Sequence, residues 1–145
     1  NEVKHSPSLI IAADTIVAIG QKVLGKPSSI IEAKYFLKEL SGQEHYVYTG
    51  VVLIVVIELK QDKYCFTEKT KVSFNCLTNE QINYYVEKFL PLDKAGAYGI
   101  QEVPSNFIKS IEGEYENVVG LPLIKLKKLL NKLSKLYPEI NFNIK

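Results

Sequence analysis

The chain has 145 residues, of which 46% are hydrophobic and 23% charged, and its formal net charge is +2. That length suits one domain, and the composition excludes a disordered or collagen-like protein. A charge so close to zero gives no electrostatic reason to expect a protein that binds nucleic acid or an acidic membrane surface. The longest apolar run, residues 51–57, is far shorter than the roughly 20 residues of a membrane helix, so we expect no membrane span.

The first third of the chain predicts a strand followed by a helix. Residues 8–19 form an almost continuous apolar run, which is typical of a strand buried on both faces. Residues 23–24 are expected to return as a short partner strand. Ser29 and Glu32 match a capping box, and apolar residues at helical spacing follow them as far as Leu40.

The middle of the chain predicts a hairpin and a second helix. Residues 45–59 are rich in β-branched and aromatic side chains and indicate a central strand, and residues 64–74 indicate its partner, with the turn at 61–63. A second capping box, at Thr78 and Gln81, predicts a helix that runs to about residue 89.

The last third predicts a loop, a strand and a final helix. Residues 91–101 have no clean period, residues 107–111 suggest a strand, and Pro122 suits the first position of a helix. That helix carries leucines on one side and lysines on the other, which is more typical of a solvated face than of a nucleic-acid site. The whole chain, residues 1–145, therefore predicts one α/β domain whose mixed, twisted sheet is flanked by helices.

Two cysteines, Cys65 and Cys76, are too few for a disulfide scaffold. On one extended strand they would also lie too far apart to form a bridge. We therefore expect a reducing, cytoplasmic compartment. The chain contains no methionine, even at position 1, and we expect it to be a processed or shortened product.

Asp14 is the most informative single position, because it follows the five apolar residues 9–13. An ionised carboxylate in such a run is costly unless it is paired, bound to a metal or exposed at a strand end. Ligands gather at the carboxyl ends of strands in open α/β sheets. The pattern favours a metal ligand or general base about as much as a carboxylate satisfied by backbone donors or by a lysine.

Other candidate residues are weak when each is taken alone. Lys26 lies just before a helix, where a phosphate is favoured, but a solvated lysine in a turn explains it more simply. Lys94 opens a stretch of small residues that lets backbone approach a ligand, although an ordinary loop is the simpler explanation. Gln101 has an amide that can both donate to and accept from a base edge. His5 and His45 have no metal-type spacing, and we expect both at the surface or at an edge.

In combination, these motifs resemble the Maf family. The matching motifs run from about residue 9 to about residue 125, in the family's order and approximate spacing. They are ADT (13–15), GKP (25–27), LSG (40–42), HYVYTG (45–50), PLDKAGAYGIQ (91–101), IEG (111–113) and NVVGLPL (117–123).

The resemblance implies a nucleoside triphosphate pyrophosphatase that needs a divalent metal, Mg²⁺ or Mn²⁺. Such enzymes cleave between the α- and β-phosphates and release a nucleoside monophosphate and pyrophosphate. The implied fold is shared with the inosine triphosphate pyrophosphatases. The family was named for septum-formation inhibition, and dimers occur in it, so we expect a homodimer.

The resemblance also assigns roles to five residues. Asp14 matches the family's catalytic aspartate, a proton acceptor close to the metal. Thr15 and Gln101 match specificity positions of the branch that prefers dTTP and UTP. Lys26 and Lys94 match lysines that are expected near the phosphates of the substrate.

The chain departs from the family at its start. Family members carry an N-terminal strand and a loop with Ser-Pro-Arg-Arg, whereas Ser6-Pro7 is followed here by Ser8 and Leu9. Relative to the family, the domain is thus N-terminally incomplete. We expect a metal-dependent pyrophosphatase that acts on dTTP and UTP or on modified pyrimidine nucleotides. The alternative is a catalytically impaired protein that binds nucleotides or regulates cell division.

Overall fold

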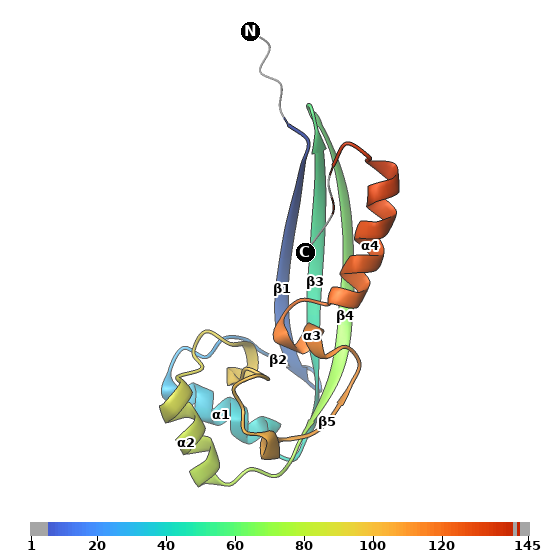
Figure 1. Ribbon diagram of the computed structural model, residues 1–145. Coiled ribbons are helices and arrows are strands. Elements are labelled where there is room, and N and C mark those ends of the chain that lie inside the picture. The colour runs from blue at the N-terminus through green and yellow to red at the C-terminus, as the bar shows by residue number, and fades with distance from the viewer. Residues whose placement is uncertain (1–5, 141, 143–145) are drawn as a thin grey trace.

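The computed structural model describes residues 6–140 and 142 (Figure 1). The strands are β1 (Ser8–Ile19), β2 (Lys22–Leu24), β3 (Glu44–Ile57), β4 (Lys60–Phe74) and β5 (Ile108–Glu112). The helices are α1 (Ile30–Leu40), α2 (Asn79–Phe89), α3 (Tyr115–Val119) and α4 (Leu123–Leu136), with 3₁₀ turns η1 (Ala95–Ala97) and η2 (Ser105–Phe107). No helix in this part of the chain is both long and apolar enough to cross a bilayer.

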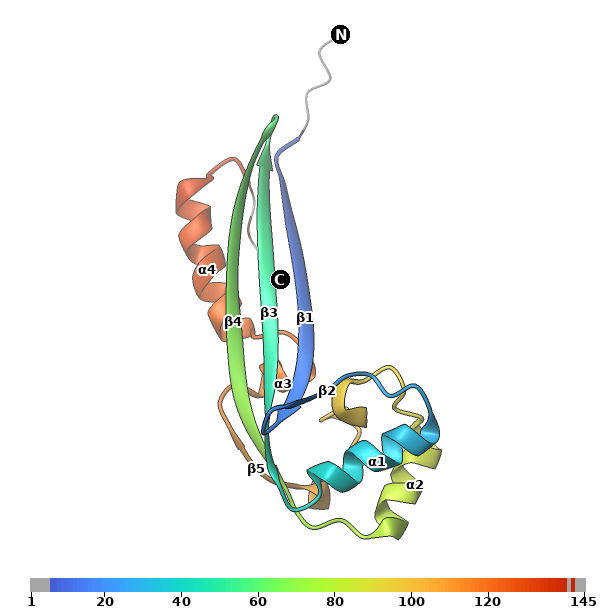
Figure 2. The same cartoon turned by 180° about the vertical axis from the view of Figure 1, so that it is seen from behind.

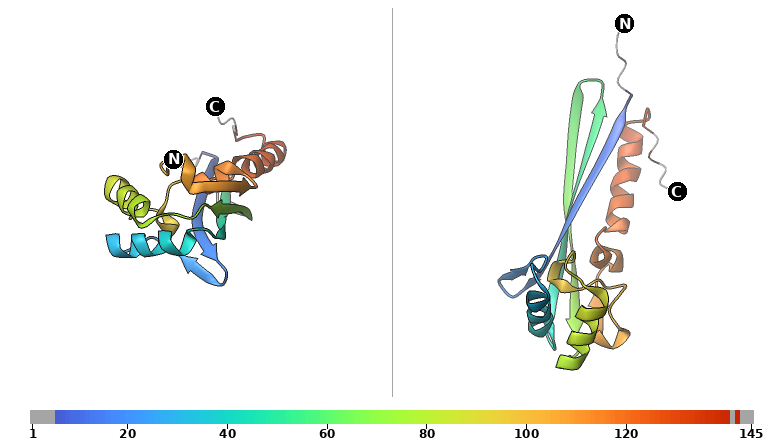
Figure 3. Two further views of the ribbon diagram at one scale, coloured as in Figure 1. Left: turned by 90° about the horizontal axis from the view of Figure 1, so that it is seen from below. Right: turned by 90° about the vertical axis from the view of Figure 1, so that its left-hand side faces the viewer.

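The five strands form one twisted sheet in the order β2-β1-β3-β4-β5 (Figure 3). The predicted α/β class, with helices flanking a sheet, is confirmed. Every strand pair among the described residues is antiparallel, so the predicted mixed sheet is wrong there. The reason is that α1 does not carry the chain back to the start of β1. Strand β3 begins beside the end of β1, where Tyr46 pairs with Ala18, and must run the opposite way.

The molecule has two parts joined by the long strands (Figures 1 and 2). At one end, α1 and α2 pack near β2 and the lower ends of β3 and β4. At the other end, α4 lies along the long arm of the sheet. One hydrophobic cluster joins α1 and α2 to the sheet and includes Val47 of β3. The buried leucines of α4 pack with the inward-facing residues of β3 in a second cluster, which contains Val51, Leu53, Val55, Leu126, Leu130 and Leu133.

Strand β1 matches the predicted range, but it is not buried on both faces. Residues 8–14 are mostly exposed, and the side chains of Ile10 and Ile11 are 53% and 38% exposed. Over this stretch β1 is paired only with β3, and the α4 leucines pack against β3. Asp14 is therefore tolerated in an apolar run because its strand is exposed to water.

Local signals in the sequence are largely confirmed. The Ser29 hydroxyl accepts from the Glu32 backbone, and Thr78 and Gln81 form the complete reciprocal capping box. The Glu32 carboxylate binds the Ser28 amide and hydroxyl instead of closing a box on Ser29, and the pKa of Glu32 is lowered by these bonds. The predicted hairpin turn at 61–63 is wrong, because the strands continue to a tighter turn at residues 58–59.

His45 is buried, contrary to the surface position expected from the sequence. Its Nε2 lies 2.8 Å from the Tyr98 hydroxyl, and its ring meets Phe74 and Tyr98 edge-on. The period of two along β3 turns His45 inward with Val47 and Thr49. Burial lowers the pKa of His45 to about 4. The other histidine, His5, lies outside the described residues.

We expect the protein to lose stability as the pH falls from 7.5 to 5.5. Unfolded His45 takes up a proton near its ordinary pKa of 6.5, whereas folded His45 resists protonation down to about pH 4. The unfolded state therefore binds more protons in this window, and the free energy of unfolding should fall by about 1 kcal/mol. Urea unfolding of a His5→Gln variant at several pH values measures this loss, and His45→Gln should abolish it. A folded His45 ring that titrates near pH 6.5 by NMR would contradict the prediction.

Candidate functional site

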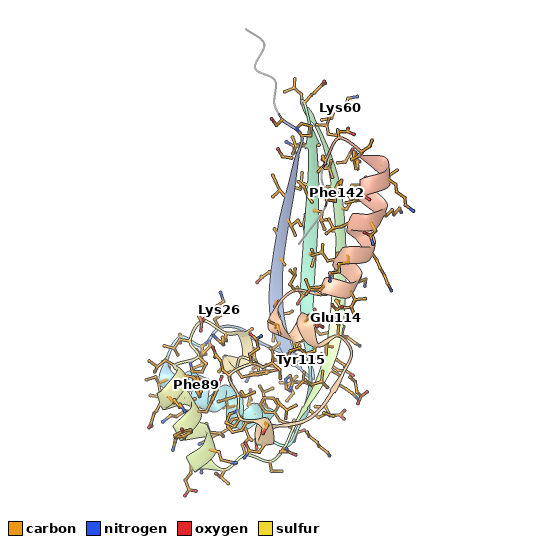
Figure 4. All side chains as sticks on the ribbon, in the orientation of Figure 1. Lys26, Lys60, Phe89, Glu114, Tyr115 and Phe142 are labelled. Atoms are coloured by element: carbon orange, nitrogen blue, oxygen red, sulfur yellow. The ribbon has the colours of Figure 1, made fainter. Side chains whose placement is uncertain are left out.

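A cavity of about 460 Å³ lies against the lower part of β1, where five stretches of chain converge. Its walls come from β1, from the loop after β2, from Val47 of β3, from residues 93–102 and from residues 118–120. Figure 4 shows Lys26 at the top of the part that holds α1 and α2. The cavity thus lies beside the junction between the two parts of the molecule.

All five residues singled out from the sequence line this one cavity. They are Asp14, Thr15, Lys26, Lys94 and Gln101. The first two lie on β1, Lys26 lies on the loop that leads to α1, and the last two flank the turn η1. The structure brings these residues together from stretches up to 87 positions apart in the sequence, while their chemical roles stay predictions.

Two glycines bring the lysine-bearing loops together. The Gly96 amide donates to the Gly25 carbonyl at 3.0 Å, which ties η1 to the loop that carries Lys26. Gly96 has a φ of +68°, and a Cβ there would lie only 3.0 Å from the Val17 side chain. A residue with a side chain would therefore push η1, and with it Lys94, away from β1.

Asp14 projects from an open position on β1. It lies opposite Gly50 of β3 in the strand register, and its Oδ1 accepts from the Thr15 amide at 3.0 Å. Because Gly50 has no side chain, nothing from the facing residue covers the carboxylate. The carboxylate is exposed to solvent and remains available to a ligand in the cavity.

Lys94 is held by two carboxylates that the sequence analysis missed. Its Nζ lies 3.2 Å from both oxygens of Asp93 and 3.4 Å from Oε1 of Glu102. Burial alone would lower the pKa of Lys94, but the hydrogen bond to Asp93 and the charge of Glu102 outweigh it and raise that pKa. Lys94 is thus a charged ammonium at the cavity wall. Asp93 lies within the PLDKAGAYGIQ motif (residues 91–101) and Glu102 directly follows it, which was the available signal.

Gly99 makes room for the pair between Lys94 and Glu102. A Cβ on Gly99 would lie 2.7 Å from Cε of Lys94 and 3.1 Å from Oε2 of Glu102. The Gly99 amide donates to the Tyr85 hydroxyl at 3.2 Å, so α2 also positions this loop.

Thr15 is bound to the opposite wall of the cavity. Its Oγ1 lies 2.8 Å from Oγ1 of Thr49 and 3.4 Å from the Gly120 carbonyl. Thr49 in turn donates to the Asn117 carbonyl at 3.3 Å. These bonds attach residues 117–120, from the NVVGLPL motif, to the two central strands.

The cavity fits a Mg²⁺ ion that is bound by the carboxylate of Asp14 and not by a full set of protein ligands. Residues 6–140 and 142 contain no group of three His, Cys, Asp or Glu side chains placed to hold a metal. Mg²⁺ commonly takes one or two carboxylates and completes its shell with water and substrate phosphates. The exposed carboxylate of Asp14, which lines the same cavity as Lys26 and Lys94, fits that arrangement.

Comparison with known proteins agrees with these motifs. Residues 1–133 match the family model described as Maf-like protein. The chain is 51% identical over 122 residues to a dTTP/UTP pyrophosphatase of Thermosipho melanesiensis, covering 84% of this chain and 65% of that protein. It is 50% identical over 129 residues to one of Carboxydothermus hydrogenoformans, covering 89% and 68%. It is 48% identical over 120 residues to one of Thermotoga maritima, covering 83% and 57%.

The chain covers between 57% and 68% of the length of these three relatives. The matched region includes every motif that contributes a residue to the cavity. This chain therefore belongs to the Maf-like protein family.

Proposed function

We propose that the protein hydrolyses nucleoside triphosphates to the monophosphate and pyrophosphate, with dTTP, UTP or modified pyrimidine nucleotides as substrates. The observation that carries the proposal is the single cavity that collects Asp14, Thr15, Lys26, Lys94 and Gln101. The names of the relatives, dTTP/UTP pyrophosphatases at about half identity, support the same activity.

In the proposed reaction, water attacks the α-phosphorus and the bond to the bridging oxygen of the β-phosphate breaks. Pyrophosphate leaves with that oxygen, and Asp14 accepts the proton of the water. Lys26 and Lys94 bind phosphate oxygens and offset their negative charge. A divalent cation, Mg²⁺ or Mn²⁺ held by Asp14, supplies further charge neutralisation when it is bound.

Lys94 must exchange partners in order to bind a phosphate. In the structure its ammonium is shared between Asp93 and Glu102. The Asp93 side chain is largely exposed, so this pair is weak and readily exchanged for a phosphate oxygen. The two carboxylates hold Lys94 at the cavity wall until a triphosphate arrives.

The test is pyrophosphate release from a panel of nucleoside triphosphates in the presence of Mg²⁺ or Mn²⁺. We expect dTTP and UTP to be hydrolysed faster than dCTP, dATP and dGTP. Tight binding of dTTP by a folded protein that releases no pyrophosphate would favour the catalytically impaired alternative. A partner protein that binds equally well to wild type and to Asp14→Asn would favour a regulatory function.

We also propose that the protein forms a homodimer through the outer edge of β1. Among the described residues, that edge is paired only at residues 17–19, by β2, while residues 8–16 leave it open. An open edge strand can pair antiparallel with the same strand of a second copy about a two-fold axis. The side chains of Ile10 and Ile16 are exposed along this stretch of β1.

Sedimentation over a range of protein concentrations tests the dimer. We expect Ile10→Lys to shift it towards monomer, because a charged side chain on an edge strand opposes pairing. Tyr84→Lys, at an exposed site on α2, which forms no part of the sheet, is the control. A wild-type monomer at every concentration would contradict the proposal.

We propose a cytoplasmic location, because nucleoside triphosphates are cytoplasmic and the free, exposed thiols of Cys65 and Cys76 suit a reducing compartment. We also propose that residues 1–145 belong to one domain, since β3 runs through both hydrophobic clusters. A single cooperative unfolding transition would support that organisation.

A further inference from the structure

Two threonine hydroxyls meet at the cavity wall. Thr15 of β1 and Thr49 of β3 lie directly opposite each other in the strand register, with their Oγ1 atoms 2.8 Å apart. Thr15 lines the cavity, whereas Thr49 is completely buried. The buried hydroxyl of Thr49 therefore contacts the hydroxyl of Thr15, the residue that lines the cavity.

The hydroxyl protons of Thr15 and Thr49 are both used in hydrogen bonds within the protein. The remaining neighbours are two backbone carbonyls, which only accept: that of Asn117 beside Thr49 and that of Gly120 beside Thr15. Thr15 either donates to Thr49, which donates to the Asn117 carbonyl, or it accepts from Thr49 and donates to the Gly120 carbonyl. In both arrangements the proton of Thr15 stays within the protein.

An outward O–H at Thr15 is the unfavourable arrangement. Turning this proton into the cavity would give up its bond to Thr49 or to Gly120, and partly buried acceptors are costly to leave unpaired. Thr15 Oγ1 thus offers the cavity only lone pairs, and a ligand group that meets it must donate a hydrogen bond.

We infer that Thr49 is a positioning residue that makes Thr15 an acceptor and thereby selects a base with a ring N–H. This inference rests on the proposed function and names the group that is recognised. Uracil and thymine carry N3–H between two carbonyls, whereas cytosine has an unprotonated N3 that would face the lone pairs of Thr15. The Gln101 amide, on the same cavity, can donate to the adjoining carbonyl of the base.

A second buried threonine supplies a matched control. Thr70 of β4 is also completely buried, donates to the Glu114 carbonyl at 2.8 Å and accepts from Asn117 Nδ2 at 3.1 Å. It holds the same loop as Thr49 does, but it has no hydrogen bond to Thr15. Thr70→Val therefore removes a comparable buried hydroxyl without freeing the proton of Thr15.

The experiment measures the affinity for dUTP and dCTP analogues in which an NH group replaces the oxygen between the α- and β-phosphates. Calorimetry is run on wild type, Thr49→Val, Thr49→Ser and Thr70→Val. We expect Thr49→Val to reduce the preference for the dUTP analogue roughly three- to tenfold, the effect of one hydrogen bond. Thr49→Ser and Thr70→Val should keep the wild-type preference. For hydrolysis of dUTP itself, the change in Thr49→Val should appear in KM and not in kcat.

Other outcomes overturn the inference. A folded Thr49→Val with an unchanged preference, or an equal loss in Thr70→Val, would show that the hydroxyl of Thr49 does not set the selection. If Thr49→Val does not fold, wild type alone decides, because an N3-methylated dUTP analogue that binds as tightly as the parent excludes an acceptor at Thr15. A clear dUTP preference without pyrophosphate release would support the inference and contradict the proposed hydrolysis.

Discussion

Replacing Asp14 by asparagine is expected to lower kcat for pyrophosphate release by at least about a hundredfold, because the amide cannot accept the proton of the attacking water. The carboxylate is exposed and its only described bond is an acceptance from the neighbouring Thr15 amide, which an asparagine oxygen can reproduce. The variant should therefore fold as wild type does. Initial rates with dTTP and saturating Mg²⁺ measure the effect, and circular dichroism confirms the fold.

Asp93→Asn is the matched control for this prediction. It removes the same unit of charge from the same cavity, but Asp93 contacts Lys94 rather than an open position on β1. We expect its kcat to stay within a few-fold of wild type. An equal loss in both variants would mean that the charge of the cavity matters and that Asp14 is not the proton acceptor.

Replacing Leu53 by alanine is expected to lower the free energy of unfolding by about 3 kcal/mol. Leu53 is completely buried in the cluster between β3 and α4, so the change removes apolar contacts and leaves a cavity. Ile54, the next residue, points to the opposite face of the sheet and is only half-buried. Ile54→Ala should therefore cost roughly 1 kcal/mol.

Urea unfolding of the two variants measures the difference. Both residues lie on β3 between β1 and β4, and both changes remove nearly the same side-chain volume. The difference between the two losses therefore reports mainly which face of the sheet α4 covers. Equal losses would contradict this arrangement of α4 on the sheet. A larger loss in Ile54→Ala would indicate that the open face is covered by a partner in solution.

The candidate site was predictable from the sequence to an unusual degree because its parts lie in short motifs. Asp14 and Thr15 adjoin in one strand, Lys26 precedes a capped helix, and Lys94 and Gln101 bound one glycine-containing loop. The residues that position them were not predictable. Thr49 lies within the HYVYTG motif and Glu102 directly after PLDKAGAYGIQ, but only the structure shows that they contact Thr15 and Lys94.

The sequence by itself determined the local structure, namely the range of β1, the caps at Ser29 and Thr78 and the helices that follow them. These features depend on interactions between residues a few positions apart, which periodicity and capping report directly. Only the tertiary structure decided that the sheet is antiparallel, that β1 is exposed and that His45 is buried. An apolar run has the same pattern whether a helix layer covers it or water does, so burial depends on where distant elements such as α4 come to lie.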